Sequence, residues 1–79
     1  MRARVQVMLK ESVLDPQGEA VKHALGSLGF AGIDSVRQGK LIEIDLQETD
    51  SDTARAKVTE MCEKLLSNTV IEDFDITIL

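Results

Sequence analysis

The sequence contains no tryptophan or tyrosine, only two phenylalanines, and a single cysteine, proline and histidine. So few aromatic rings leave little surface on which bases or flat cofactors could stack. The lone cysteine, Cys62, cannot form an internal disulfide, so nothing indicates an oxidising compartment. Nine basic residues against fourteen acidic ones give a formal net charge of −5. This argues against nucleic-acid binding, which requires clustered Lys and Arg to neutralise phosphates.

Long apolar runs are also missing. No run reaches the roughly 20 residues of a membrane span, and residues 1–9 lead into an alternating pattern rather than the apolar core of a signal peptide. We therefore expect no membrane association and a cytoplasmic location. With 79 residues the chain has room for one domain, 1–79, and its core should be small enough to make the monomer marginally stable.

What the chain does have is regular alternation of apolar and polar residues. Residues 3–9 and 72–79 alternate as half-buried strands do. Residues 33–37 and 40–47 predict two further strands, joined at Gln38-Gly39 as a hairpin. The sequence therefore predicts four strands.

Two helices are predicted between these strands. Asp15 is a favoured N-cap and Pro16 a favoured first helical residue, and Gly29 stands where a helix end needs a left-handed backbone. The acidic stretch 49–52 predicts the start of a second helix that ends near Asn68. The expected inner faces are Ala20, Val21, Ala24, Leu25 and Leu28 in the first helix, and Ala54, Val58, Met61, Cys62, Leu65 and Leu66 in the second.

The order strand, helix, strand, strand, helix, strand predicts an α+β fold of the ferredoxin-like βαββαβ type. In that arrangement an antiparallel sheet carries both helices on one face. Each element has one apolar side, so all of them can share a single core.

No catalytic, cofactor-binding or metal site is predicted in this chain. The glycine-rich stretch 26–32 lies at the end of a helix, whereas phosphate loops precede a helix, so we expect it to end the helix and turn the chain. Cys62 and His23 are expected to point apart, which argues against an enzyme that uses a cysteine nucleophile. The acids at 48–52 alternate as in a calcium loop, but the required glycine and glutamate are absent.

The outer face of the predicted sheet is a mixture of apolar and charged side chains. It is either a protein-binding surface or a solvated face with cross-strand pairs such as Arg4 with Glu43 or Asp75. Both interpretations remain open from the sequence. The expected outer residues are Arg4, Gln6, Met8, Leu41, Glu43, Asp45, Asp75 and Thr77.

Five segments, taken in order, resemble a known family. They are Val13–Gly18, Leu28–Phe30, Ser35–Lys40, Cys62–Asn68 and Val70–Phe74. The chain is similar over essentially its whole length to the small PurS subunits of phosphoribosylformylglycinamidine synthase. It departs from the family pattern at residues 10–12 and at Thr69, both expected in loops.

The resemblance implies a non-catalytic subunit of an ATP-dependent glutamine amidoligase of de novo purine biosynthesis. Such a subunit would bridge a PurQ-type glutaminase and a large PurL-type synthase, and would assist ammonia transfer to formylglycinamide ribonucleotide. ATP and magnesium would belong to the synthase partner, with no cofactor in this chain. Family members form homodimers or dimers of dimers.

Two loops carry more polar residues than turn formation requires, and we predict that they contact the partner subunits. A plain helix start at Asp15-Pro16 and solvated charge at Arg37 and Lys40 are the alternatives. A different function also stays open: a small ferredoxin-like regulatory domain that binds an amino acid. The predicted contact residues are Leu14, Asp15, Pro16, Gln17, Arg37, Gln38, Gly39 and Lys40.

Overall fold

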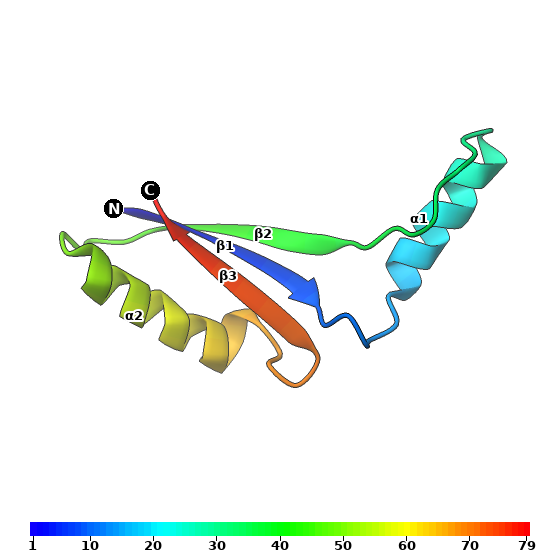
Figure 1. Cartoon of the computed structure of the whole chain (residues 1–79). Helices are drawn as coiled ribbons and strands as arrows, with labels where there is room; N and C mark the ends of the chain where they lie inside the picture. Colours follow the sequence, from blue (N-terminus) through cyan, green and yellow to red (C-terminus); the bar gives the residue numbers. More distant parts are fainter.

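The computed structural model describes all residues, 1–79, as a three-stranded antiparallel sheet with two helices (Figure 1). The strands lie in the order β2-β1-β3, so β1 is central and both later strands are edges. The elements in chain order are β1 (Arg2–Leu9), α1 (Pro16–Ser27), β2 (Gly39–Asp45), α2 (Ser51–Met61), the π-helical turn η1 (Cys62–Leu66) and β3 (Glu72–Ile78).

The core lies between the central strand and α2. Alternate residues of β1, namely Ala3, Val5 and Val7, are buried because successive side chains of a strand point to opposite faces. Val5 is paired with Ile42 of β2 and Ile76 of β3, which lie on the same face and extend the apolar layer. The strands predicted at 3–9, 40–47 and 72–79 are confirmed, with bounds that differ by a residue or two.

Helix α2 covers this apolar face. Its N-cap is Asp50, whose carboxylate accepts the Thr53 N–H at 2.9 Å. Ala54, Val58 and Cys62 follow at helical spacing and are all buried against the sheet. The helix continues into η1, where the Ser67 hydroxyl donates to the Cys62 carbonyl at 3.1 Å.

Helix α1 begins and ends where the sequence predicts. Pro16 is its first residue and Asp15 its N-cap. At the other end, Gly29 has φ +95°. The Gly29 N–H donates to Gly26 O and the Phe30 N–H to Leu25 O, both at 3.1 Å. This is the Schellman pattern, so the predicted role of the glycine-rich stretch in ending the helix is confirmed.

The position of α1 differs from the prediction. The helix projects away from the sheet at the far end of β1, while α2 alone lies on the sheet face (Figure 1). The radius of gyration is 16.0 Å, whereas a compact domain of this length has about 12 Å. The fold is α+β and ferredoxin-like as predicted, but the expectation of two helices on one sheet face is wrong for the single chain.

The predicted strand at 33–37 is also wrong. The predicted hairpin would fold residues 33–37 back against residues 40–47. Instead these residues run beside α1, where Lys22 Nζ donates to the Asp34 carbonyl at 2.9 Å and Arg37 Nη2 donates to the Leu9 carbonyl at 2.6 Å, and the outer edge of β2 stays unpaired. Gln38-Gly39 consequently leads into β2 and does not form a hairpin turn.

Candidate functional site

Four of the predicted contact residues meet where α1 leaves the sheet. The Asp15 carboxylate joins two segments that are far apart in the chain: Oδ1 accepts the Gly18 N–H at 3.0 Å and Oδ2 accepts the Gln38 N–H at 2.7 Å. The Gln38 side-chain amide donates to Gln17 Oε1 at 3.1 Å. We call this group, Asp15, Gln17, Gly18, Arg37 and Gln38, the clasp.

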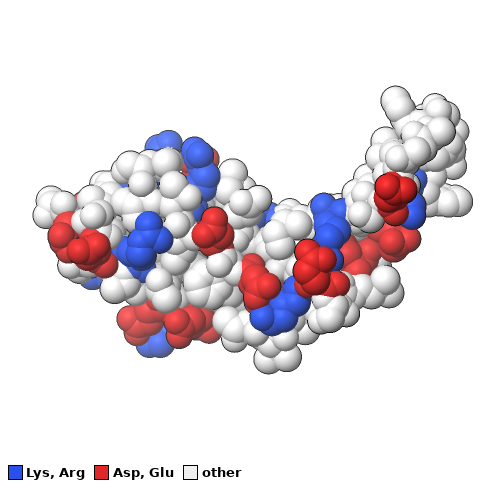
Figure 2. Space-filling view, viewed as in Figure 1, with Lys and Arg blue, Asp and Glu red and all other residues white.

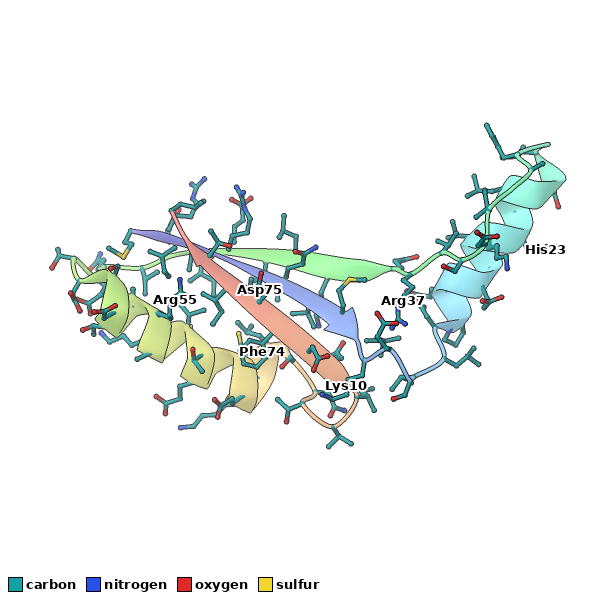
Figure 3. All side chains as sticks on the ribbon, viewed as in Figure 1. Lys10, His23, Arg37, Arg55, Phe74 and Asp75 are labelled. Carbon is teal, nitrogen blue, oxygen red and sulfur yellow. The ribbon has the colours of Figure 1, made fainter.

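Arg37 supplies the second half of the clasp. Its Nη2 donates to the carbonyls of Leu9 at 2.6 Å and Lys10 at 2.9 Å, and Nη1 donates to Glu11 O at 3.3 Å. These carbonyls end β1 and begin the linker to α1. The planar guanidinium, with donors in a fixed fork, satisfies several acceptors that a lysine could not reach together. Arg37 lies at the base of α1 in Figure 3.

Close backbone approach completes the clasp. Gly18 is buried, and a Cβ there would overlap the carbonyl oxygen of Val36. The segment that returns from α1 therefore lies directly against the first turn of the helix. Any larger residue at position 18 would push this segment away.

The clasp also sets the ionisation of Asp15. Hydrogen bonds from the Gln38 and Gly18 amides stabilise the carboxylate, and with a smaller contribution from nearby Arg37 they lower the pKa of Asp15. The carboxylate is charged at neutral pH, so both bonds are charge-assisted.

The other predicted contact residues surround the clasp without joining it. Leu14 and Pro16 are exposed at the start of α1, and Lys40 is exposed on β2. Gly39 lies where a Cβ would overlap the side chain of Met8. The alternative for Arg37, a solvated charge, is wrong, because its guanidinium binds backbone carbonyls within the chain. Contact with partner subunits stays a prediction for the whole set.

An open apolar surface along α1 was not predicted from the sequence. Helix α1 buries only Gly18. Along its apolar side Leu25 is half-buried and Val21 is 39% exposed, and just past its last residue Leu28 is 74% exposed and Phe30 is 60% exposed. The upper end of α1 shows few charged side chains in Figure 2. We call Val21, Ala24, Leu25 and Leu28 the α1 face.

A matching hollow lies between β2 and α2. It has a volume of about 450 Å³, and its surface is mainly apolar. Met61 and Leu65 were expected to be inner residues of the second helix, but both are exposed here. We call this hollow the α2 groove; it is lined by Ile44, Lys57, Glu60, Met61, Lys64, Leu65 and Leu66.

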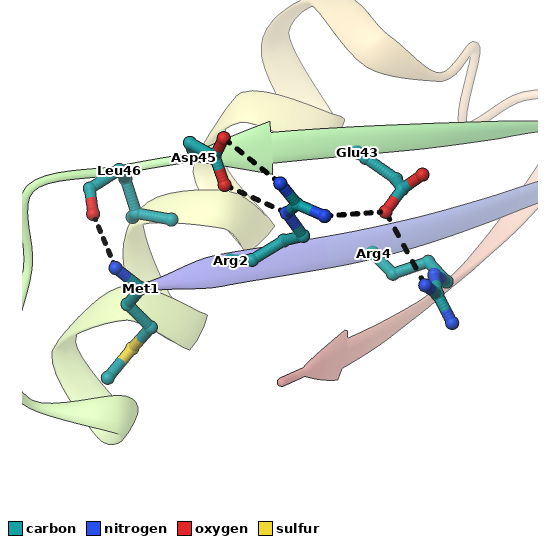
Figure 4. A network of polar contacts seen from close by, with 6 residues as sticks. All are labelled: Met1, Arg2, Arg4, Glu43, Asp45 and Leu46. Atoms are coloured by element: carbon teal, nitrogen blue, oxygen red, sulfur yellow. Dashed lines mark hydrogen bonds and ion pairs between the residues drawn. The ribbon is translucent and has the colours of Figure 1, made fainter.

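The outer sheet face carries cross-strand ion pairs (Figure 4). Arg2 Nε lies 2.9 Å from Asp45 Oδ1, and Arg4 Nη2 lies 3.4 Å from Glu43 Oε2. The Arg2 guanidinium lowers the pKa of Asp45 by hydrogen bonding. The predicted pairing of Arg4 with Glu43 is confirmed, which favours the interpretation of a solvated face at this end of the sheet.

Residues with catalytic potential lie apart. Cys62 is buried beneath the sheet, where burial raises the pKa of its thiol. His23 lies on α1, away from the sheet (Figure 3). No three His, Cys, Asp or Glu side chains lie close enough to hold a metal ion together. No helix is both long and apolar enough to cross a membrane.

Comparison with known proteins gives consistent matches over nearly the whole chain. The family model described as PurS, phosphoribosylformylglycinamidine (FGAM) synthase, matches residues 2–79. The PurS subunit of this synthase from Bacillus subtilis is 53% identical over 73 residues, covering 92% of this chain and 86% of that protein.

Two solved structures share the fold. PurS from Methanocaldococcus jannaschii, described as a subunit of formylglycinamide ribonucleotide amidotransferase in the purine biosynthetic pathway, is 39% identical with a TM-score of 0.87, over 96% of this chain and 92% of that one. A chain of the PurLQS structure from Thermotoga maritima is 28% identical with a TM-score of 0.88, over 99% of this chain and 95% of that one.

Proposed function

The chain belongs to the PurS family of FGAM synthase subunits. We propose that it forms a dimer, and that the surfaces that join the catalytic subunits are formed only in this dimer. It is a subunit of the synthase, and we propose that the catalytic groups lie in its partners. We propose that it bridges a PurQ-type glutaminase and a PurL-type synthase and assists ammonia transfer to formylglycinamide ribonucleotide. ATP and magnesium then act in the synthase partner, and the complex works in the cytoplasm.

One observation carries the proposal: α1 stands away from the sheet, so that neither the sheet nor α2 covers its apolar face, while the α2 groove stands open. In a ferredoxin-like fold the two helices lie side by side on one sheet face. The groove borders α2 on the β2 side, which is where the first helix of such a fold would lie.

A second copy of the chain is the occupant that best fits the groove. The α1 face is an aliphatic stripe of helical spacing, and the groove is a mainly apolar trough beside a helix, lined also by Lys57, Glu60 and Lys64. Two chains related by a two-fold axis would each place α1 in the other's groove, so that both exposed surfaces are covered at once. The elongated shape, 49 × 24 × 15 Å, supports such an exchange because it leaves α1 free to reach another molecule.

The completed dimer would present duplicated loops and outer sheet faces to the catalytic subunits. Leu14, Pro16 and Lys40 remain exposed beside the clasp, and their side chains make no hydrogen bond within the chain. The T. maritima structure that matches this chain is of PurLQS, which supports partners of the PurL and PurQ type. The shared position of both loops at the base of α1 favours one continuous contact surface.

Reconstitution tests this function. The purified chain is added to the glutaminase and synthase of its own organism, and FGAM formation is measured with glutamine and, separately, with ammonium as the nitrogen donor. We expect the chain to raise the glutamine-dependent rate and to leave the ammonium-dependent rate unchanged. Indifference of the glutamine-dependent rate would contradict the bridging role, and calorimetric binding of an amino acid to the isolated chain would favour a regulatory domain instead.

A further inference from the structure

Covalent connectivity alone does not keep α1 away from its own sheet. The linker of residues 10–15 joins β1 to α1, and six residues can span about 20 Å when extended. The helix could therefore fold back over the α2 groove of the same chain, which would give a closed ferredoxin-like monomer. Something else must hold it outward.

The clasp ties together both segments that connect α1 to the sheet. Asp15 on the outgoing segment accepts the amide of Gln38 on the returning segment at 2.7 Å. Arg37 on the returning segment binds three consecutive carbonyls, Leu9 to Glu11, on the outgoing one. Swinging α1 back over the sheet would separate these segments and break the bonds.

Closed monomer and exchanged dimer would bury the same surfaces. In both arrangements the α1 face lies in an α2 groove, so these contacts contribute similarly to either state. The equilibrium between the closed monomer and the exchanged dimer is then decided by the conformation of the connecting segments. Charge-assisted hydrogen bonds such as those of Asp15 and Arg37 are the strongest interactions present there.

We propose that Asp15 and Arg37 are positioning residues that hold α1 extended, so that it seats in the groove of a second copy and not on its own sheet. This inference rests on the dimer of the proposed function. In this inference the two residues favour the open chain, with α1 extended, over the closed chain, with α1 on its own sheet. This role is separate from any contact with the catalytic subunits.

The test uses substitutions that keep the helix and remove the clasp. Asp15→Ser retains a good N-cap for α1 but loses the second oxygen that accepts the Gln38 amide. Arg37→Lys retains the charge but loses the fork. Asp50→Ser is the matched control, because Asp50 caps α2 through Thr53 and makes no bond to a distant segment.

Two measurements are made on the full-length chains. Sedimentation velocity over a range of concentrations gives the dimer dissociation constant. Spin labels at His23→Cys and Thr77→Cys, in chains diluted with an excess of unlabelled chain, give the distance between α1 and β3 within one molecule. Cys62 is buried and is not expected to react.

We expect the wild-type chain and Asp50→Ser to form dimers with a long distance between the labels. The Asp15→Ser, Arg37→Lys double variant should weaken dimerisation roughly tenfold or more, equivalent to about 1.4 kcal/mol, and should populate a shorter distance. A double variant with an unchanged dissociation constant and distance would overturn the clasp while leaving the dimer intact. A monomeric wild-type chain would overturn the dimer itself and with it this inference.

A second variant covers the case in which the double variant fails to fold. Gly18→Ala favours helix formation but forces the Val36 carbonyl away from α1. It should shift the chain toward the closed monomer with undiminished helix content by circular dichroism. Unchanged dimerisation of a helical Gly18→Ala chain would count against the proposal.

Discussion

Helices α1 and α2 are built alike and used differently. They have 12 and 11 residues, and each begins with an aspartate whose carboxylate accepts the amide three residues later. Yet α2 buries Ala54 and Val58 under the sheet, whereas α1 buries only a glycine. Capping therefore fixes where a helix starts, but the surface that covers its apolar face is decided by the rest of the assembly.

The largest predicted effect contrasts the two apolar faces. Val58→Asp places an unpaired charge in the core and should lower the free energy of unfolding by about 4 kcal/mol or more. Val21→Asp on α1 should leave the sheet and α2 folded but abolish the dimer. Urea unfolding of each variant, followed at a concentration where the wild-type chain is monomeric, checks the difference. Equal destabilisation by both would show that α1 packs on its own chain.

The groove can be tested against an equally exposed site. Leu65 in the α2 groove is 82% exposed and Val70 outside it is 81% exposed. Leu65→Glu should weaken dimerisation by roughly 100-fold, as expected for a residue buried at the centre of an interface, while Val70→Glu should have little effect. Sedimentation equilibrium gives both constants. A similar loss in the two variants would place the interface elsewhere.

Two glycines at the end of α1 allow a comparison of backbone conformations. Gly29 has φ +95°, so Gly29→Val should cost about 1–2 kcal/mol because a left-handed backbone is strained for a β-branched residue. Gly26→Ala, inside the same helix with open space around it, should stabilise the helix by about 1 kcal/mol. Circular dichroism at 222 nm during thermal unfolding should show opposite shifts. Shifts of the same sign would contradict the assigned helix end.

The smallest predicted effect is a difference between the two capping aspartates in how their contributions depend on pH. Amide hydrogen bonds lower the pKa of Asp15, and the Thr53 hydroxyl and amide lower that of Asp50. A depressed carboxyl pKa gives stability that is present above the unfolded value, about 4, and is lost as the pH falls through the folded value.

At Asp15 the loss should also reach the dimer, because protonation removes the acceptor of the Gln38 amide. The charged groups around this carboxyl are Arg37 on the returning segment, Glu19 on α1, Glu11 on the linker, Lys40 on β2 and Glu72 on β3. We expect dimerisation to weaken below about pH 4, and Asp15→Ser to remove most of that pH dependence. If the pH dependence of dimerisation were unchanged in Asp15→Ser, other carboxylates would be its cause.

Local structure could be predicted from the sequence because local patterns determine it. Alternation placed β1 and β3, and Asp15, the stretch 49–52 and Gly29 marked two helix starts and a helix end that the structure confirms. The predicted strand at 33–37 was wrong because contacts between residues far apart in the chain, such as Lys22 with Asp34 and Arg37 with Leu9, hold this segment beside α1.

The candidate site was predicted only in part for the same reason. Asp15, Gln17, Arg37 and Gln38 were selected as contact residues, but the hydrogen bonds that they make across the clasp and to the end of β1 span 21 to 28 residues. The α1 face was recognised as apolar, yet periodicity shows only that a face needs covering. Leu65 and Met61 were expected to be buried, and their exposure in the single chain is the signal for a second copy.

Cross-linking between chains tests most directly whether α1 lies in the groove of a second copy. A chain carrying Val21→Cys is mixed with a chain carrying Leu65→Cys, and disulfides are formed under mild oxidation. We predict a cross-linked heterodimer, with no product when either substituted chain is mixed with wild type. A chain carrying both substitutions that closes only within itself, with no bond between copies at any concentration, would contradict the exchange of α1.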